Sequence, residues 1–382
     1  MPGVVIVGGG QGGFQTAASL RAEGFDGPIT IIGEEPHLPY QRPPLSKGML
    51  LGKQQERHAT LRPADFYRTH KIELITGQRV ISLDLPLQRV ELANGSRIDY
   101  DRLVLATGAR NRMLSCDNAL YVRTLDESRE LRQRLLDASR VLVIGGGFIG
   151  LEVAAAARSL DKEVTVLEAA QRLMARVVAP AVSEYFRVQH EARGVRIRLN
   201  EKGERVSDGA LIVVGIGVTP NDELARDAGL AVGNGIQVNE YLQTADERVF
   251  AIGDCADYPS IHAGRRVRLE SVQNAVDQAA HVAKAITGKP APYTAVPWFW
   301  SDQFDIHLQM AGLPHGFDQT VSRGNPESNK FSTFYYREGS LIAIDSINHA
   351  AEHLTARKLI AAGVQISPEQ ATDESFDLKS VL

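Results

Sequence analysis

Short runs of β-branched and aliphatic residues, each ending at glycine, recur along this chain and predict buried strands of a parallel sheet. The run Val4–Val7 leads into Gly8, and the run Val141–Ile144 leads into Gly145. The pattern after each glycine-rich turn predicts a helix and then a second strand. The expected helices cover residues 14–22 and 148–160, and the expected strands cover 29–34, 102–110, 164–168, 211–217 and 249–255. Strands that alternate with helices in this way indicate an α/β fold.

The segments between these units carry recognisable turn and cap signals. Prolines in the stretch 37–50 fix φ and predict a rigid loop with a short helix near Leu45. Asn94-Gly95 predicts a hairpin turn, a charged helix is expected over 126–138, and Ser271 is the expected N-cap of a helix over 271–286. After Pro297 the segments 298–312 and 331–348 alternate as antiparallel strands do, and a helix over 350–361 follows. This last part is predicted to be a separate α+β domain.

Composition narrows the class of protein. The chain has 382 residues with 43% hydrophobic and 23% charged residues, and a net charge of −4 gives no reason to expect a nucleic-acid partner. The sequence enters a strand almost at once and contains no apolar run of membrane-spanning length, so we expect no targeting segment, no membrane and a cytoplasmic location. The cysteines, Cys116 and Cys255, form no C-x-x-C pair, so we expect no disulfide framework, iron–sulfur cluster or metal site, and Cys255 is expected to be a packed small residue.

Both glycine-rich turns carry the spacing G-x-G-x-x-G. The glycines are Gly8, Gly10 and Gly13 in the first turn, and Gly145, Gly147 and Gly150 in the second. The first glycine permits a tight turn, the second lets the backbone approach a diphosphate, and the third lets helix pack close to strand. Glu34 and Glu168 follow the next strand, where a carboxylate grips the adenosine ribose hydroxyls. Two such turns predict two dinucleotides, a bound flavin and a nicotinamide.

The carboxylate of Glu168 bears on the choice of nicotinamide. It can accept hydrogen bonds from two ribose hydroxyls, but it repels a 2′-phosphate, so NADH is expected rather than NADPH. Arg172 is a counter-signal, because a nearby arginine can accept that phosphate.

The ordered set of motifs resembles the FAD-dependent NADH:ferredoxin reductases of the putidaredoxin reductase type, within the glutathione-reductase-like superfamily. The matching segments are the glycine turns, PYQRPPLSK, DRLVLATGAR, YVRTLDE, GGGFIGLEVAA, GIGVTPN, AIGDCA, ESVQNAVDQA and PWFWSDQ. The resemblance implies Rossmann-like domains for FAD (residues 1–110 and 237–296) and NADH (111–236), plus the C-terminal α+β domain (297–382). It also implies a separate [2Fe-2S] ferredoxin as electron acceptor, which in turn feeds a haem-thiolate monooxygenase or a Rieske oxygenase.

The resemblance also implies roles for particular residues. Lys47 lies near the reactive central ring of the flavin and pairs with Glu152, and Arg123, Asp254 and Val272 reach the flavin nucleotide, its ribityl chain and its pyrimidine edge. The further residues expected at FAD are Gly8, Gly10, Gly12, Gly13, Glu34, Arg42, Val80, Ala106, Thr107, Gly108, Gly253 and Trp300. Those expected at NADH are Gly145, Gly147, Phe148, Ile149, Gly150, Glu168 and Gly217.

Other functions are compatible with the same motifs. A rubredoxin reductase or an NADH oxidase of the same superfamily is one alternative, although the stretch 37–47 contains no cysteine of the kind that such oxidases use. An NADH-responsive signalling flavoprotein similar to apoptosis-inducing factor is another, although it would predict a targeting segment and a basic surface. Arg265, Arg266 and Arg268 are candidates for contact with an acidic ferredoxin, or simply a solvated basic loop. The stretch 195–211 is shorter than the hairpin that the family usually has there.

Overall fold

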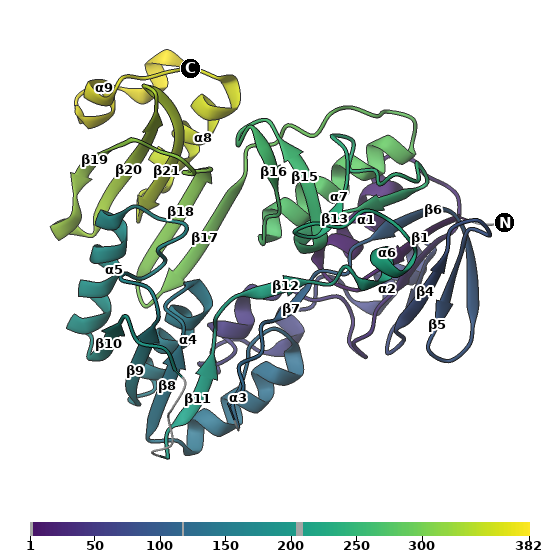
Figure 1. The fold of residues 1–382 in the computed structure, drawn as a ribbon, viewed down its shortest axis with the longest axis horizontal. Coiled ribbons are helices and arrows are strands. Elements are labelled where there is room, and N and C mark those ends of the chain that lie inside the picture. Colours follow the sequence, from purple (N-terminus) through teal and green to yellow (C-terminus); the bar gives the residue numbers. More distant parts are fainter. Residues whose placement is uncertain (1–2, 117, 204–208) are drawn as a thin grey trace. The chain divides into compact units, whose positions relative to one another are not determined.

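The computed structural model describes residues 3–116, 118–203 and 209–382, and the chain divides into two compact units. The first unit comprises Met1–Gln41, Glu56–Arg110 and Thr219–Ala295, and the second comprises Arg42–Gln55, Asn111–Val218 and Val296–Leu382. Two short strands, β7 (Ala109–Asn111) and β12 (Val218–Pro220), pair where the chain passes between the units (Figure 1). Within the described ranges, no helix is both long and apolar enough to cross a bilayer.

The first unit is built on a mixed sheet whose strand order is β3-β2-β1-β6-β5-β4, with β14 on the other side of β6. The long strand β6 pairs parallel with β1 and β14, and antiparallel with β5 through the Asn94-Gly95 turn. The strands of the first unit are β1 (Gly3–Val7), β2 (Ile29–Ile32), β3 (Ile72–Ile75), β4 (Val80–Asp84), β5 (Arg89–Leu92), β6 (Arg97–Leu105), β13 (Ile236–Gln237), β14 (Val249–Ala251), β15 (Ala256–Ser260) and β16 (Arg265–Val267). Its helices are α1 (Gln11–Ala22), η2 (Glu56–His58), α2 (Ala64–Thr69), α6 (Glu223–Asp227), η3 (Gly253–Cys255) and α7 (Val272–Ile286).

The second unit contains a parallel sheet of order β10-β9-β8-β11, with β8 (Arg140–Ile144), β9 (Glu163–Glu168), β10 (Val195–Leu199) and β11 (Leu211–Val214). Its helices are η1 (Pro43–Ser46), α3 (Leu125–Asp137), α4 (Phe148–Ser159) and α5 (Pro180–Ala192). Residues 200–203 and 209–210 contain no strand, and β11 pairs parallel with β8, so the described part of this half has no counterpart of the β4–β5 hairpin.

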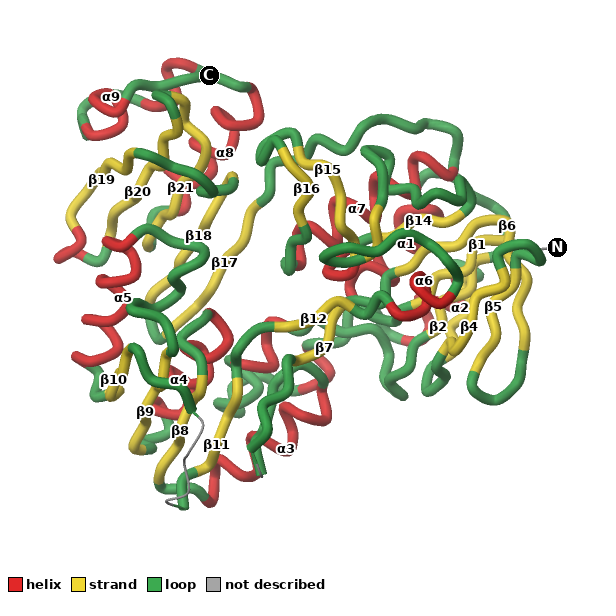
Figure 2. The backbone as a smooth tube through the Cα atoms, in the orientation of Figure 1, coloured by secondary structure: helices red, strands yellow, loops and turns green. Residues whose placement is uncertain are grey.

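The C-terminal part forms an antiparallel sheet of order β17-β18-β21-β20-β19, whose strands run side by side in Figure 2. The elements are β17 (Trp298–Gln303), β18 (Ile306–Gly312), β19 (Gln319–Asn325), η4 (Pro326–Ser328), β20 (Lys330–Arg337), β21 (Ser340–Ile347), α8 (Ala350–Ala362), α9 (Pro368–Thr372) and η5 (Leu378–Val381). Helix α8 packs on β18 and β21, while Phe186 of α5 and Phe331 of β20 lie in one buried cluster. The C-terminal sheet and the β8–β11 domain therefore share a hydrophobic core.

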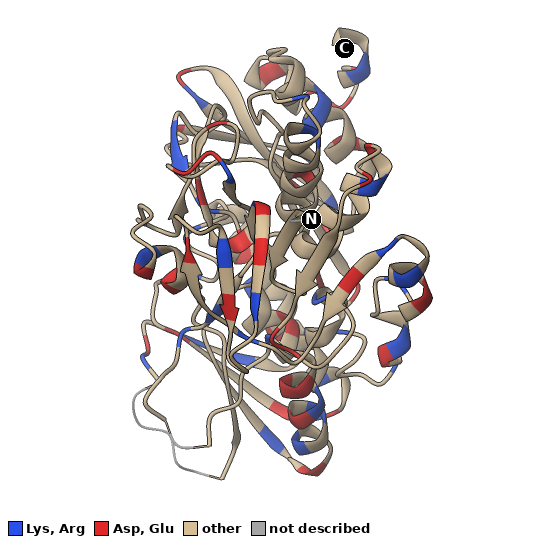
Figure 3. Ribbon diagram, turned by 90° about the vertical axis from the view of Figure 1, so that its right-hand side faces the viewer, with Lys and Arg blue, Asp and Glu red and all other residues tan. Residues whose placement is uncertain are grey.

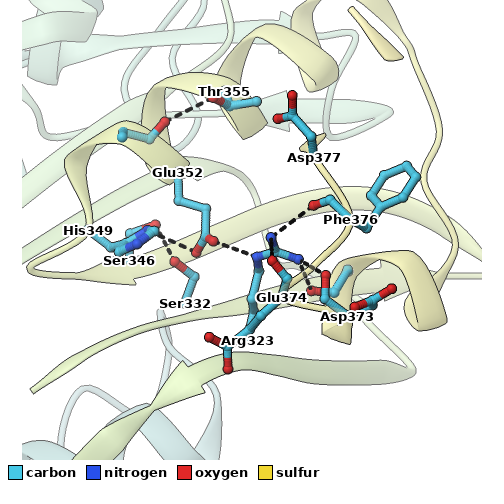
Figure 4. Close-up of polar contacts among 12 residues, drawn as sticks. Arg323, Ser332, Ser346, His349, Glu352, Thr355, Asp373, Glu374, Phe376 and Asp377 are labelled. Atoms are coloured by element: carbon cyan, nitrogen blue, oxygen red, sulfur yellow. Dashed lines mark hydrogen bonds and ion pairs between the residues drawn. The ribbon is translucent and has the colours of Figure 1, made fainter. Parts of the chain in front are cut away.

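A buried arginine ties the end of the chain to this sheet (Figure 4). The Arg323 guanidinium donates to Glu352 Oε1 at 2.7 Å, and to the backbone carbonyls of Glu374 and Phe376 at 3.2 and 3.0 Å. It also donates to the carbonyl of Asp373. Because the Arg323 and Glu352 side chains are only 10% and 8% exposed, this pair holds the C-terminal segment by charge-assisted bonds shielded from water.

Candidate functional site

The first glycine turn connects β1 to α1, and its glycines have the distinct roles that the spacing predicts. Gly8 has φ +127°, and a Cβ added there would lie 2.1 Å from the Ala106 carbonyl oxygen. A Cβ on Gly13 would lie 1.9 Å from the Gly8 oxygen, so helix and turn touch at this point. At Gly10, the N-cap of α1, no atom of the described residues lies within 4 Å of an added Cβ. Open space therefore faces the uncapped N-terminus of α1, where a diphosphate can approach the backbone.

The second turn, between β8 and α4, reproduces this geometry. Gly145 has φ +109°, and its added Cβ would lie 2.4 Å from the Gly215 oxygen. A Cβ on Gly150 would meet the Gly145 oxygen at 2.0 Å, whereas one on Gly147 would meet nothing within 4 Å in the described part of the chain. Both turns thus provide the same cradle, open at the middle glycine and closed at the other two, and both fit a dinucleotide diphosphate.

The acidic residues after the turns are not equivalent, contrary to the sequence prediction. Gly8 N–H donates to the Ile32 oxygen and Gly145 N–H to the Leu167 oxygen, each at 2.8 Å. The structural counterpart of Glu168 is therefore Gly33, and Glu34 lies one residue further along.

Their surroundings differ accordingly. Glu168 accepts from the N–H groups of Gly146 and Ala170 at 2.6 and 2.7 Å, so its carboxylate is fixed beside the turn. The Glu34 side chain is 70% exposed and lies 3.9 Å from Arg79. Only Glu168 is held by its own glycine turn.

The guanidinium of Arg172 is held by backbone carbonyl groups close to Arg172 in the sequence. It donates to the carbonyl oxygens of Val178 and Ala175 at 2.8 and 2.6 Å. These bonds engage both terminal nitrogens of the Arg172 guanidinium with carbonyl oxygens, which makes this arginine a weaker candidate for binding a 2′-phosphate.

The predicted pair of Lys47 and Glu152 is confirmed. Lys47 Nζ lies 2.7 Å from Glu152 Oε2, and the Glu152 side chain is 1% exposed. Ser46 and Ser301 also donate to this carboxylate, at 2.5 and 2.6 Å. Sequence reasoning missed these serines because they lie 106 and 149 residues from Glu152 in the chain. Serine hydroxyls and a lysine together stabilise a negative charge that burial alone would disfavour.

The other residues predicted at the flavin fall into both units. In the first unit, the strand ends are brought together: Gly12 faces Ile252, and Gly253 N–H donates to Gln278 of α7 at 2.7 Å. This group contains Gly8, Gly10, Gly12, Gly13, Ala106, Thr107, Gly108, Gly253, Asp254 and Val272, with Val80 buried at the start of β4. The second unit contains Arg42, Lys47, Arg123 and Trp300, and Arg42 donates to the Arg123 carbonyl. It also contains the residues predicted at NADH, with Phe148, Ile149 and Gly150 in the first turn of α4 and Gly217 after β11.

The helix start at Val272 is well defined. Ser271 is the N-cap, and its hydroxyl accepts from the Asn274 N–H at 3.1 Å, as predicted. The positive end of a fifteen-residue helix favours a negative charge by about 0.3–1 kcal/mol.

Trp298 and Trp300 face one side of β17, with ring centroids 5.6 Å apart. Cys255 is fully buried, and burial raises the pKa of its thiol, in agreement with a packing role.

The basic cluster of the first unit is not a free patch. Arg266 contacts the Asp257 carboxylate at 3.4 Å, and Arg268 contacts that of Glu270 at 2.7 Å with its own side chain 6% exposed. Lys and Arg residues lie among Asp and Glu residues along the elements in Figure 3. Arg268 therefore gives little support to a ferredoxin contact, whereas Arg265 and Arg266 are exposed.

Comparisons with known proteins agree with this geometry. Residues 2–279 match the pyridine nucleotide-disulphide oxidoreductase family, and residues 298–382 match the reductase C-terminal family. The chain is 47% identical to rhodocoxin reductase from Rhodococcus erythropolis, with 98% of this chain and 93% of that protein covered. The ferredoxin reductase for the CYP199A2 system from Rhodopseudomonas palustris has a TM-score of 0.95 at 48% identity, with 100% and 99% coverage. Putidaredoxin reductase, in a covalent complex with putidaredoxin, has a TM-score of 0.96 at 39% identity, with 100% and 98% coverage. The chain therefore belongs to the pyridine nucleotide-disulphide oxidoreductase family, as a ferredoxin reductase of the putidaredoxin reductase type.

Proposed function

We propose that this protein takes a hydride from NADH onto FAD and passes single electrons to a [2Fe-2S] ferredoxin that feeds an oxygenase. The observation that carries the proposal is the repetition of one diphosphate cradle, open at Gly10 and again at Gly147, within a single chain. Two nicotinamides have no reason to react with each other, whereas a resident flavin and a soluble nicotinamide do.

We assign FAD to residues 1–110 and 237–296, and NADH to residues 111–236, with 297–382 as the C-terminal domain. The glycine turn after β1 holds the FAD diphosphate, and Asp254 holds the ribityl chain. The backbone N–H of Val272 meets the pyrimidine edge, where the N-terminus of α7 favours negative charge. The turn after β8 holds the NADH diphosphate, and Glu168 accepts from the ribose hydroxyls. Glu168 already binds two backbone N–H groups, yet a carboxylate has about four lone-pair sites and can accept more.

FAD supplies the conversion between hydride transfer and one-electron transfer. The protein's own residues bind and orient the reactants, so positioning and charge stabilisation control the rate. Lys47 and Glu152 act at the flavin's central ring as a charged pair whose geometry the surrounding hydroxyls fix. No general base is needed for this chemistry.

The acceptor is inferred from the relatives. Putidaredoxin reductase forms a complex with putidaredoxin, and we infer that a ferredoxin docks on this chain as well. Redox encounters of this type use small interfaces and electrostatic steering. We also propose a cytoplasmic location, since Cys255 is a free thiol, which persists in reducing compartments.

The test is a multiple-turnover assay with purified holoprotein, NADH and separate one-electron acceptors. We expect rapid reduction of at least one [2Fe-2S] ferredoxin, with NADH preferred over NADPH. A rubredoxin in place of the ferredoxin, and oxygen alone, test the rubredoxin reductase and NADH oxidase alternatives. Faster turnover with either of these than with every ferredoxin would contradict the proposal.

A further inference from the structure

A chain of buried polar side chains extends from Glu152 into the C-terminal sheet. Glu152 Oε2 faces Lys47 and Ser46, while Oε1 accepts from Ser301 Oγ at 2.6 Å. Ser301 Oγ accepts in turn from Gln303 Nε2 at 3.2 Å, and Gln303 Oε1 lies 2.8 Å from His190 Nε2.

The negative charge of Glu152 sets the direction of every hydrogen bond in this network of side chains. An ionised carboxylate only accepts, so the Ser301 hydroxyl must donate to it and must accept from the Gln303 amide. The Gln303 oxygen then accepts from His190 Nε2–H. Burial lowers the pKa of His190 to about 4, so the ring is neutral at pH 7. The acceptor at Gln303 Oε1 places the single ring proton on Nε2. All donors therefore point toward Glu152.

The network is held rigidly. Ser301 and Gln303 are alternate residues of β17, so their side chains share one face of the sheet, and both are fully buried. His190 of α5 is also fully buried. Away from water, a broken bond in such a network is not replaced by solvent, so each member restrains its neighbour strongly.

We propose that Ser301 is a positioning residue for the redox reaction: by fixing Oε1 of Glu152, it aims Oε2 at Lys47 and so sets the position of the lysine charge. Without the serine hydroxyl, nothing restrains Oε1, and the terminal torsion of Glu152 can drift within its broad energy well. This inference rests on the proposed function, because Lys47 affects the reaction only if FAD is bound. Through Ser301, the C-terminal domain would then contribute to the position of the lysine charge in the reductase.

The experiment compares the holoenzyme variants Ser301→Ala, Ser301→Thr and Ser332→Ala. The matched control Ser332 is also a fully buried serine of the C-terminal sheet, but its hydroxyl donates to Ser346 at 3.0 Å (Figure 4). The readouts are the midpoint potential of the bound flavin, the rate constant of its reduction by NADH, FAD content and thermal unfolding. Ser301→Ala should lower the rate constant about tenfold. A tenfold change in the reduction equilibrium would shift the potential by about 30 mV for a two-electron couple. Ser301→Thr should keep the wild-type rate constant and midpoint potential, and Ser332→Ala should change neither.

A second background separates positioning from general damage. When Lys47→Met is present, Ser301→Ala should cause no further shift in the potential, since the charge that it positions is gone. An equal shift in that background, or no shift in Ser301→Ala alone, would overturn the proposal. If Ser301→Ala does not fold, Ser301→Cys provides the same comparison, because a thiol is a weak donor. A wild-type flavin that NADH does not reduce would instead overturn the proposed function.

Discussion

Replacing the middle glycine of the second turn should separate nucleotide binding from folding. In Gly147→Ala the backbone (φ −84°, ψ −178°) suits alanine, and the added methyl group meets no described atom within 4 Å. We expect the free energy of unfolding to change by less than about 1 kcal/mol. The methyl group occupies the space that the NADH diphosphate needs, so KM for NADH should rise at least about tenfold, which corresponds to about 1.4 kcal/mol of lost binding.

Gly150→Ala is the matched contrast. Its methyl group would lie 2.0 Å from the Gly145 carbonyl oxygen, and no rotamer relieves a clash between Cβ and backbone. The cost should reach about 3 kcal/mol, the upper range for overpacking, with a melting temperature lower by several degrees. Thermal unfolding and steady-state kinetics at saturating ferredoxin measure both effects. The reasoning is refuted if Gly147→Ala keeps the wild-type KM, or if it unfolds as readily as Gly150→Ala.

Three further substitutions test other parts of the structure. Glu168→Gln removes the charge but keeps the shape, so the ratio of NADH to NADPH efficiency should fall about tenfold; an unchanged ratio would show that the charge does not select the nucleotide. Burial raises the pKa of Asp345 to about 7, so the folded state binds an extra proton between about pH 4 and 7, and stability from this group falls by about 1.4 kcal/mol per pH unit as pH rises. The free energy of unfolding, measured with urea, should therefore fall more between pH 5 and pH 8 for the wild type than for Asp345→Asn. An equal fall in the two proteins would refute this. Arg323→Met leaves the buried carboxylate of Glu352 without its guanidinium, so the C-terminal domain should lose about 3–5 kcal/mol and residues 368–382 should become sensitive to protease, whereas wild-type resistance would contradict the role of this arginine.

Features set by neighbours in the chain could be predicted from the sequence. The glycine turns, the Asn94-Gly95 hairpin and the Ser271 cap each depend on residues within a few positions of one another. Strand β19, QTVSRGN, was missed because it lacks the apolar alternation that marks a half-buried strand.

Features set by tertiary pairing could not be read in the same way. The one-residue offset between Glu34 and Glu168 follows from strand register, which fixes Gly33 opposite the first turn. The bonds of Ser46 and Ser301 to Glu152 join segments more than a hundred residues apart. The pair of Lys47 and Glu152 could be expected only through resemblance to a family, because nothing in the local sequence of either residue indicates the other.

In the proposed function, one chain holds two different dinucleotides that react with each other. The most direct test is an anaerobic titration of the FAD-loaded protein with NADH, followed through the visible absorbance of the flavin. An equimolar amount of NADH should bleach the flavin, and the colour should return when oxidised ferredoxin is added. A flavin that stays oxidised in excess NADH, or a purified protein that takes up no FAD, would contradict it.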